Sequence, residues 1–264
     1  MAFAELKARQ SVMWGAGPYE PIVELTRGVH DVLLARLEPR PGERWLDVAT
    51  GTGAVALRAA MAGADVTGID LSPALIEKAK SKAVWQGVMA RFEVGDAEAL
   101  SAPSASFDVV CSAIGTQFAP DHGAVARELA RVCRKGGRLG LACWTPDSVV
   151  ARMFAVMRPF APAPPPGAGN TFDWGRGDYV EKLLGESFAL DFEERVLTVV
   201  AESGEAMWEL FVEAYGPTRT LAASLDPERR EELHRAWVDL FEADRSAGAI
   251  RQAWRWLLVH GVRR

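Results

Sequence analysis

Runs of a few apolar residues alternate with segments whose apolar residues recur at helical spacing through the first half of the chain. Such an alternation predicts consecutive βαβ units. We therefore expect an α/β fold with a doubly wound, mostly parallel sheet between layers of helices. The predicted strands are Arg44–Val48, Asp65–Asp70, Arg91–Val94, Phe107–Ala113 and Gly137–Trp144.

The segments between these strands carry start and stop signals for helices. Ser72 precedes Pro73, which is typical of an N-cap followed by the first helical residue. Asp121 has the same role before another helical segment, and Gly136 is expected to end that helix ahead of the next strand. The segment from Ala54 to Met61 is predicted to form the helix after the first strand.

Further elements are predicted on both sides of this alternating region. Residues 1–16 and 21–37 form two expected helices, and the proline-rich segment Pro159–Gly169 is an extended connector. Counting two late strands, we expect a single domain with a seven-stranded sheet and a helical insertion before the last strand. The elements predicted after the connector are a helix at Asp178–Leu184, a strand at Phe188–Val200, helices at Glu205–Ala214 and Glu228–Asp244, and a strand at Arg255–Val262.

Composition narrows the classes of protein. The net charge of −5 and the lack of a clustered basic patch argue against a nucleic acid as the main partner. No apolar run reaches the ~18 residues of a membrane span, and residues 1–10 are too charged for a signal peptide. Three cysteines without metal-ligand or paired spacing predict reduced, buried thiols and no metal site. We therefore expect a cytoplasmic protein.

A glycine-rich turn follows the first predicted strand and is the most informative motif. The strand ends in Asp47, and Gly51 and Gly53 allow a ligand to approach the main chain closely. The following helix would present unpaired N–H groups to that ligand. Asp47 places a negative charge beside it, which favours an ammonium or sulfonium group over a pyrophosphate.

Carboxylates also stand at the ends of the next two strands. Asp70 can accept hydrogen bonds from the hydroxyls of a ribose bound at the glycine turn. Asp96 can accept a hydrogen bond from an adenine amino group. The fourth strand ends near Ser112, at the topological switch point where such sheets bind ligands.

The order of these motifs resembles a class I S-adenosylmethionine-dependent methyltransferase. It is most similar to the small-molecule branch that includes quinone-ring C-methyltransferases, and the likeness covers roughly residues 10–145, with Trp174-Gly175 beyond. The motifs that carry it are DVATGTG from Asp47, VTGID from Val66, VGDAEAL from Val94, FDVVCSAIGTQFAPD from Phe107 and ELARVCRKGGRLGLACW from Glu128.

The resemblance implies S-adenosylmethionine as cofactor, S-adenosylhomocysteine as product and a small-molecule methyl acceptor. Asp47 and the turn would hold the amino acid part, Asp70 the ribose, and Asp96 the adenine edge. The turn of this family often begins with a glycine where this chain has an alanine. The other residues implied to contact the cofactor are Ala49, Thr50, Gly51 and Gly53 in the turn, Leu71 and Ala97 at the adenine, and Ser112 near the methionine portion.

The resemblance also divides the chain by role. Residues 1–41 would form an N-terminal helical lid, 42–146 the cofactor-binding core, and 147–264 the substrate part. Tyr19 would contact the cofactor from the lid, and Trp14 is a second candidate lid residue. Phe211 has helical spacing that favours core packing, although it can also line a substrate pocket.

Other interpretations of the same motifs remain. Gly51-x-Gly53-x-x-Ala56 also fits a dinucleotide fingerprint, so an NAD(P)-dependent oxidoreductase is one alternative, against which Asp47 argues. A cofactor-binding cyclase or regulatory module that transfers no methyl group would show the same motifs. His122 is a weak candidate for a catalytic base, whereas His30 is expected to be structural. The acceptor, the methylated atom (O, N or C) and the oligomeric state stay open.

Overall fold

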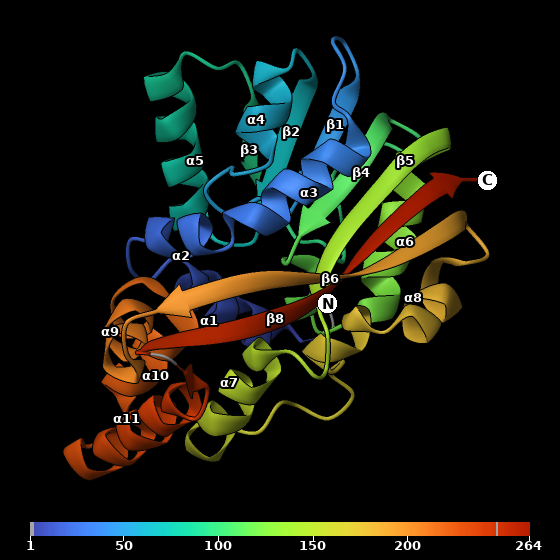
Figure 1. Cartoon of the computed structure of the whole chain (residues 1–264). Helices are drawn as coiled ribbons and strands as arrows, with labels where there is room; N and C mark the ends of the chain where they lie inside the picture. Colours follow the sequence, from blue (N-terminus) through green and yellow to red (C-terminus); the bar gives the residue numbers. More distant parts are fainter. Residues whose placement is uncertain (1–2, 247) are drawn as a thin grey trace.

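A mixed β-sheet forms the centre of the molecule (Figure 1). The computed structural model describes residues 3–246 and 248–264. Across the sheet the strands follow the order β3-β2-β1-β4-β5-β8-β6, and the short β7 pairs with β8. The strands are β1 (Arg44–Val48), β2 (Asp65–Asp70), β3 (Arg91–Val94), β4 (Phe107–Ala113), β5 (Cys133–Trp144), β6 (Phe188–Ala201), β7 (Arg245–Ser246) and β8 (Ala249–Arg263).

The predicted α/β fold with a mostly parallel sheet is confirmed. Strands β3, β2, β1, β4 and β5 are parallel, so their carboxyl ends lie at one edge of the sheet. Strand β8 is antiparallel to both β5 and β6, and its pairing with β6 runs from Phe188↔Arg263 to Ala201↔Ile250. The helical insertion before the last long strand is present as well, because α9, α10 and α11 lie between β6 and β8 in the sequence.

Helices cover both faces of the sheet. Helices α3, α4 and α5 pack against one face, and α6 and α8 lie on the other, as a doubly wound sheet requires (Figure 1). Neighbouring residues of β1 bury their side chains in different core clusters, Trp45 on one face and Leu46 on the other. The α-helices are α1 (Ala4–Trp14), α2 (Glu20–Leu25), α3 (Arg27–Leu37), α4 (Ala56–Met61), α5 (Pro73–Gln86), α6 (His122–Val132), α7 (Val149–Met157), α8 (Gly177–Leu184), α9 (Gly204–Ala214), α10 (Gly216–Ser224) and α11 (Pro227–Glu242).

The N-terminal region differs from the expectation at one point. Residues 21–37 do not form one helix, because the chain breaks at Thr26 between α2 and α3. The Thr26 hydroxyl donates to the carbonyl of Ile22 at 2.8 Å, a local side-chain bond that competes with regular helix geometry. The break lets α2 turn away from the sheet and contact α9.

Four further elements depart from the predicted boundaries. Helices α7 and α10 were not predicted. Helix α7 has an N-cap, because the Ser148 hydroxyl accepts a hydrogen bond from the N–H of Val150. Strand β5 begins at Cys133 rather than at Gly137, directly after α6. Strand β8 begins at Ala249 rather than at Arg255, because its first part pairs with the end of β6 beyond the rest of the sheet.

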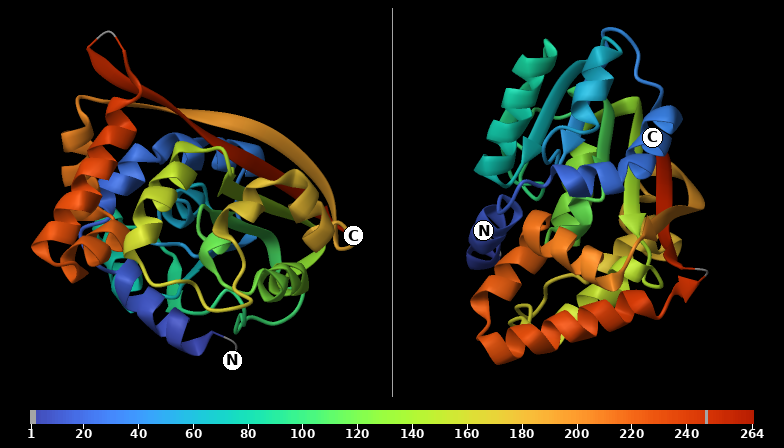
Figure 2. Two further views of the ribbon diagram at one scale, coloured as in Figure 1. Left: turned by 90° about the horizontal axis from the view of Figure 1, so that it is seen from below. Right: turned by 60° about the vertical axis from the view of Figure 1, so that its left-hand side comes forward.

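The helices outside the sheet layers gather near the carboxyl edge of the strands. Helix α1 contacts α10 and α5, α2 contacts α9, and α11 contacts both α9 and α7. Figure 2 shows this group beside the sheet, with the long β6–β8 ribbon reaching towards it. In the ranges described, no helix is long and apolar enough to cross a membrane.

Candidate functional site

One cavity opens at the carboxyl edge of the sheet. Its empty volume is about 1340 Å³, the open mouth included. The predicted cofactor residues that line the cavity are Tyr19, Asp47, Ala49, Thr50, Gly51, Asp70, Leu71, Asp96 and Ala97.

Asp47 lies at the end of β1 and is 2% exposed. One carboxylate oxygen accepts hydrogen bonds from the Thr50 hydroxyl at 2.7 Å and from the N–H of Ala56 at 3.2 Å. For the other carboxylate oxygen, the described residues offer one hydrogen-bond donor, the Cys111 thiol at 3.6 Å. Burial raises the pKa of Asp47 from 3.8 to about 6, against the effect of these hydrogen bonds. A cation in the cavity would lower that pKa and hold the carboxylate charged.

The glycine turn after Asp47 has the backbone conformation that its sequence requires. Ala49, Gly51 and Gly53 all have positive φ angles, of 56°, 57° and 83°. A Cβ placed on Gly51 would meet nothing within 4 Å, so the main chain at that residue is open to a ligand. Gly53 does not line the main cavity and is packed against Phe92 and Leu57 instead.

Asp70, at the end of β2, is oriented by the main chain on both sides. Its Oδ2 accepts from the N–H of Gly51 at 2.9 Å, and its Oδ1 accepts from the N–H of Ser72 at 2.8 Å. Burial raises the pKa of this carboxyl, while the two N–H groups oppose the shift. These contacts connect the ends of β1 and β2 and fix the carboxylate on the cavity wall, beside Leu71.

Asp96 has a partner that the sequence did not indicate. Lys7 of α1 donates to Asp96 Oδ2 at 2.7 Å and to Glu98 Oε2 at 2.6 Å, and it also lines the cavity. The Lys7 side chain is 9% exposed, and its pKa is raised because the two carboxylates together outweigh desolvation by burial. The N-terminal helix is therefore attached to the segment after β3 by a nearly buried ion pair.

Besides Gly53, two residues singled out in the sequence are not part of the cavity lining. Ser112 is 1% exposed, and its hydroxyl accepts from the N–H of Thr116 at 3.1 Å. His122 is 4% exposed, with Nδ1 2.8 Å from the Tyr179 hydroxyl and its ring edge-on to Trp174. Burial lowers the pKa of His122. His122 is not among the residues that line the cavity, because its side chain on α6 contacts Tyr179 of α8 and Trp174, so its role as a base stays a prediction.

Two aromatic residues of the N-terminal segment, for which a lid role is predicted, border the cavity. Trp14 and Tyr19 both line the cavity, at the end of α1 and the start of α2. The turn between these helices is closely packed, since a Cβ on Gly15 would lie 2.7 Å from both Ala74 Cβ and Ser72 Oγ. This turn therefore lies directly on the loop that carries Asp70.

Several lining residues were missed by the sequence analysis. His30, expected to be structural, reaches the cavity, and burial lowers its pKa to about 4, so the imidazole is neutral and a weak proton acceptor. The remaining ones come from segments far apart in the chain and carried no local signal. They include Gln10, Phe118, Trp144, Val150, Met153, Tyr215 and Trp254. Phe211, for which the sequence left a pocket role open, lines the cavity as well.

Comparison with known proteins places this geometry in a family. Residues 46–141 match the family model described as a methyltransferase domain. An uncharacterized protein of Mycobacterium tuberculosis is 36% identical over 264 residues, covering 98% of this chain and 96% of that protein. The 27-O-demethylrifamycin SV methyltransferase of Amycolatopsis mediterranei is 42% identical over 121 residues, covering 45% of this chain and 44% of that enzyme.

A solved structure supports the fold. The YcgJ protein of Bacillus subtilis matches with a TM-score of 0.63 at 20% identity, over 90% of this chain and 99% of that chain. The matched family segment starts within β1 and ends within β5, so it contains the glycine turn and the three strand-end carboxylates. The chain therefore contains a methyltransferase domain in an α/β Rossmann-like methyltransferase fold, and it shares nearly its whole length with the uncharacterized mycobacterial protein.

Proposed function

We propose that this protein transfers a methyl group from S-adenosylmethionine to a small-molecule acceptor. The observation that carries the proposal is the convergence of Asp47, Asp70 and Asp96, from the ends of three parallel strands, on one cavity. Such a row of carboxylates suits a ligand with an ammonium or sulfonium group at one end and a ribose and adenine beyond it. It suits a pyrophosphate poorly.

The residues present fit this cofactor. One carboxylate oxygen of Asp47 accepts a hydrogen bond only from a thiol within the described residues. It can therefore accept a charge-assisted hydrogen bond from an ammonium group. Ala49, Thr50 and Gly51 would hold the amino acid part against the open main chain. Asp70 would accept from the ribose hydroxyls through the lone pairs not used by Gly51 and Ser72. Leu71, Asp96 and Ala97 would contact the adenine, and Tyr19 would cover the cofactor.

When bound, the cofactor would supply an electrophilic methyl group, so the chain need not form a covalent intermediate. The contribution of the protein would be to hold the acceptor atom in line with that methyl group, which can lower a barrier by about 7–11 kcal/mol in well-oriented cases. The lid residues Trp14 and Tyr19 would also exclude water from the cavity.

Calorimetric titration of the purified protein tests cofactor use directly. S-adenosylmethionine and S-adenosylhomocysteine are expected to bind, and NADH is not. Asp47→Asn is expected to weaken both of the first two by about tenfold or more, since it removes a charge-assisted contact of about 1.5–3 kcal/mol. Clean binding of NADH with no heat from either adenosyl compound would refute the proposal.

Turnover separates methyl transfer from the alternatives that only bind. The assay measures S-adenosylhomocysteine formed from S-adenosylmethionine in the presence of a panel of phenols, amines and carbon acids. Product formation with at least one acceptor is expected. Tight binding of the cofactor with no product from any acceptor would instead favour a cyclase or a regulatory module.

A further inference from the structure

Six aromatic residues form a continuous wall in the cavity. Successive ring centroids lie 4.7 Å apart for Phe118 and Trp14, 5.7 Å for Trp14 and Tyr215, and 5.4 Å for Tyr215 and Phe211. The series continues from Phe211 to Trp254 at 6.3 Å and from Trp254 to Trp144 at 5.8 Å. All six line the cavity, and we call them the aromatic wall.

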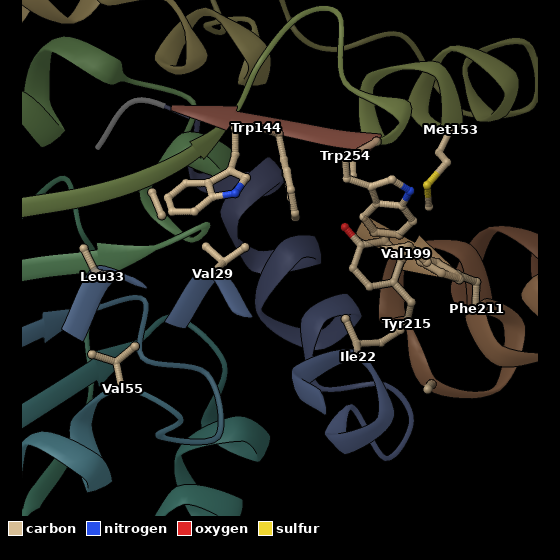
Figure 3. Close-up of a cluster of buried hydrophobic side chains, with 14 of the residues drawn as sticks. Ile22, Val29, Leu33, Val55, Trp144, Met153, Val199, Phe211, Tyr215 and Trp254 are labelled. Carbon is tan, nitrogen blue, oxygen red and sulfur yellow. The ribbon is translucent and has the colours of Figure 1, made fainter. Parts of the chain in front are cut away.

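The aromatic wall comes from the peripheral helices and the ends of β5 and β8. Figure 3 shows Trp144 and Trp254 on their strands, with Phe211 and Tyr215 approaching from α9 and its end. Met153 of α7 lies beside Trp254, and Ile22 of α2 lies below Tyr215. The surface is therefore broad, rigid and apolar, since buried aromatic rings that contact one another have little freedom to move.

The charged residues of the described part of the cavity come from elements other than α7, α9 and β8. The charged residues that line the cavity are Lys7 on α1 and three carboxylates at the ends of the first three strands, Asp47, Asp70 and Asp96. Lys7 is already paired with Asp96 and Glu98. Within residues 3–246 and 248–264, no lining residue on α7, α9 or β8 carries a charge, and His30 is neutral at physiological pH. An acceptor with a formal charge would lose its hydration at the wall without gaining an ion pair.

Two phenol hydroxyl groups of the cavity lining belong to stacked tyrosines. Tyr19 and Tyr215 stack with ring centroids 6.4 Å apart, and their hydroxyls make no hydrogen bond to the described part of the chain. Burial raises the pKa of both phenols, so both stay protonated and can donate. A hydroxyl donor of a cavity-lining residue that has no partner among the described residues favours a ligand that brings an acceptor oxygen.

We propose that the methyl acceptor is an uncharged, flat ring compound whose oxygen accepts a hydrogen bond from the Tyr215 hydroxyl while its ring packs on the aromatic wall. This inference rests on the proposed function, because it concerns the second ligand of the same cavity. It excludes amino acids, phosphorylated metabolites and other charged small molecules as acceptors. Aromatic surfaces of this kind bind flat ligands through offset-stacked or edge-to-face contacts.

Binding of matched probes tests the inference independently of turnover. The protein is saturated with S-adenosylhomocysteine and titrated by calorimetry with 1-naphthol, 1-naphthalenesulfonate and 1-naphthylmethylammonium, which share one ring system. We expect 1-naphthol to bind at least about tenfold more tightly than either charged probe. Equal or tighter binding of a charged probe, or no binding of 1-naphthol, would overturn the inference.

The substitution Tyr215→Phe tests the hydroxyl. It is expected to weaken 1-naphthol by about three- to tenfold, the loss of one neutral hydrogen bond, and to leave naphthalene unchanged because naphthalene has no oxygen. Equal losses for both probes would show a packing effect and refute the assigned hydrogen bond. Phe211→Leu is the matched packing variant and is expected to weaken both probes alike.

The two proposals fail in different ways. If S-adenosylhomocysteine itself gives no heat, the proposed function is wrong. If it binds normally and the charged probes are preferred, the methyltransferase proposal stands and the acceptor class is wrong.

Discussion

The methyl group of Ala49 occupies space that Gly115 leaves free. A Cβ on Gly115 would lie 2.4 Å from Ala49 Cβ and 3.0 Å from the Ala49 carbonyl oxygen. Ala49 has a φ of 56°, a conformation that glycine adopts without strain. The chain therefore accommodates an alanine in the glycine turn through a missing side chain on the opposite strand end.

This pair gives a double-mutant test. Gly115→Ala is expected to destabilise the protein by about 2–3 kcal/mol through overpacking, while Ala49→Gly changes stability by less than about 1 kcal/mol. In the double variant, Ala49→Gly should recover at least about 1 kcal/mol of the loss, because the two Cβ atoms no longer collide. Denaturant unfolding measures all four proteins. Simple additivity would show that the two residues are not coupled.

The buried charge of Asp47 predicts a conflict between stability and binding. A pKa of about 6 instead of 3.8 means that the charged carboxylate costs up to about 3 kcal/mol at neutral pH in the ligand-free protein. Asp47→Asn should therefore raise the melting temperature of the free protein while weakening S-adenosylmethionine. Thermal unfolding with and without cofactor checks this. A less stable ligand-free variant would contradict it.

The same carboxyl predicts the pH dependence. Because its pKa is higher in the folded than in the unfolded state, the folded protein binds more protons between pH 3.8 and about 6, so the contribution of Asp47 to stability falls as pH rises through that window. Cofactor affinity changes in the opposite direction, since the carboxylate must be charged. We expect about tenfold weaker binding at about pH 5 than at about pH 8. The Asp47→Asn variant is the control and should show a much smaller change.

Lys7 predicts a measurable link between α1 and the cofactor site. Lys7→Met leaves Asp96 and Glu98 without their cation and is expected to cost about 2–4 kcal/mol of stability. It should also speed dissociation of S-adenosylhomocysteine, measured by stopped-flow fluorescence. The exposed pair Lys80–Glu77 offers a control, and Lys80→Met should cost less than about 0.5 kcal/mol. Unchanged stability and dissociation in Lys7→Met would refute the link.

For the His122 variant we expect a loss of stability without a comparable loss of activity. His122→Gln should leave methyl transfer within about threefold of the parent protein and cost about 1–2 kcal/mol of stability, because the Tyr179 hydroxyl loses its partner. Turnover of S-adenosylmethionine and denaturant unfolding provide the two readouts. A loss of activity by about a hundredfold with unchanged cofactor binding would return His122 to the role of base.

The parts of the fold that local sequence determines were predicted well. Strands β1 to β4 begin and end at the predicted residues, because β1, β2 and β4 are short, mostly buried runs and the half-exposed β3 is equally short. Helix α10 was missed because it begins at Gly216-Pro217 and Leu221 is its one large apolar side chain. Its start depends on close packing, since a Cβ on Gly216 would lie 2.1 Å from the carbonyl oxygen of Met13. Such a contact has no trace in the local sequence.

The candidate site also contains residues that the local sequence predicts and residues that it does not. Asp47 and Asp70 lie at the ends of predicted strands, and Asp96 lies just beyond another. Parallel pairing alone therefore brings the three carboxylates to one edge of the sheet. Lys7 reaches Asp96 across 89 positions, and Trp254 meets Phe211 only through the antiparallel placement of β8. Side chains that meet through tertiary packing of distant segments are beyond a reading of local pattern.

Five of the six residues of the aromatic wall lie outside residues 46–141, the stretch shared with the family, and Phe118 is the exception. Under the proposed function, the sites for the methyl donor and for its recipient are thus formed largely by different portions of the chain. Mutation can redesign the outer portions to suit a new recipient while the inherited middle portion, with its three carboxylates, stays as it is.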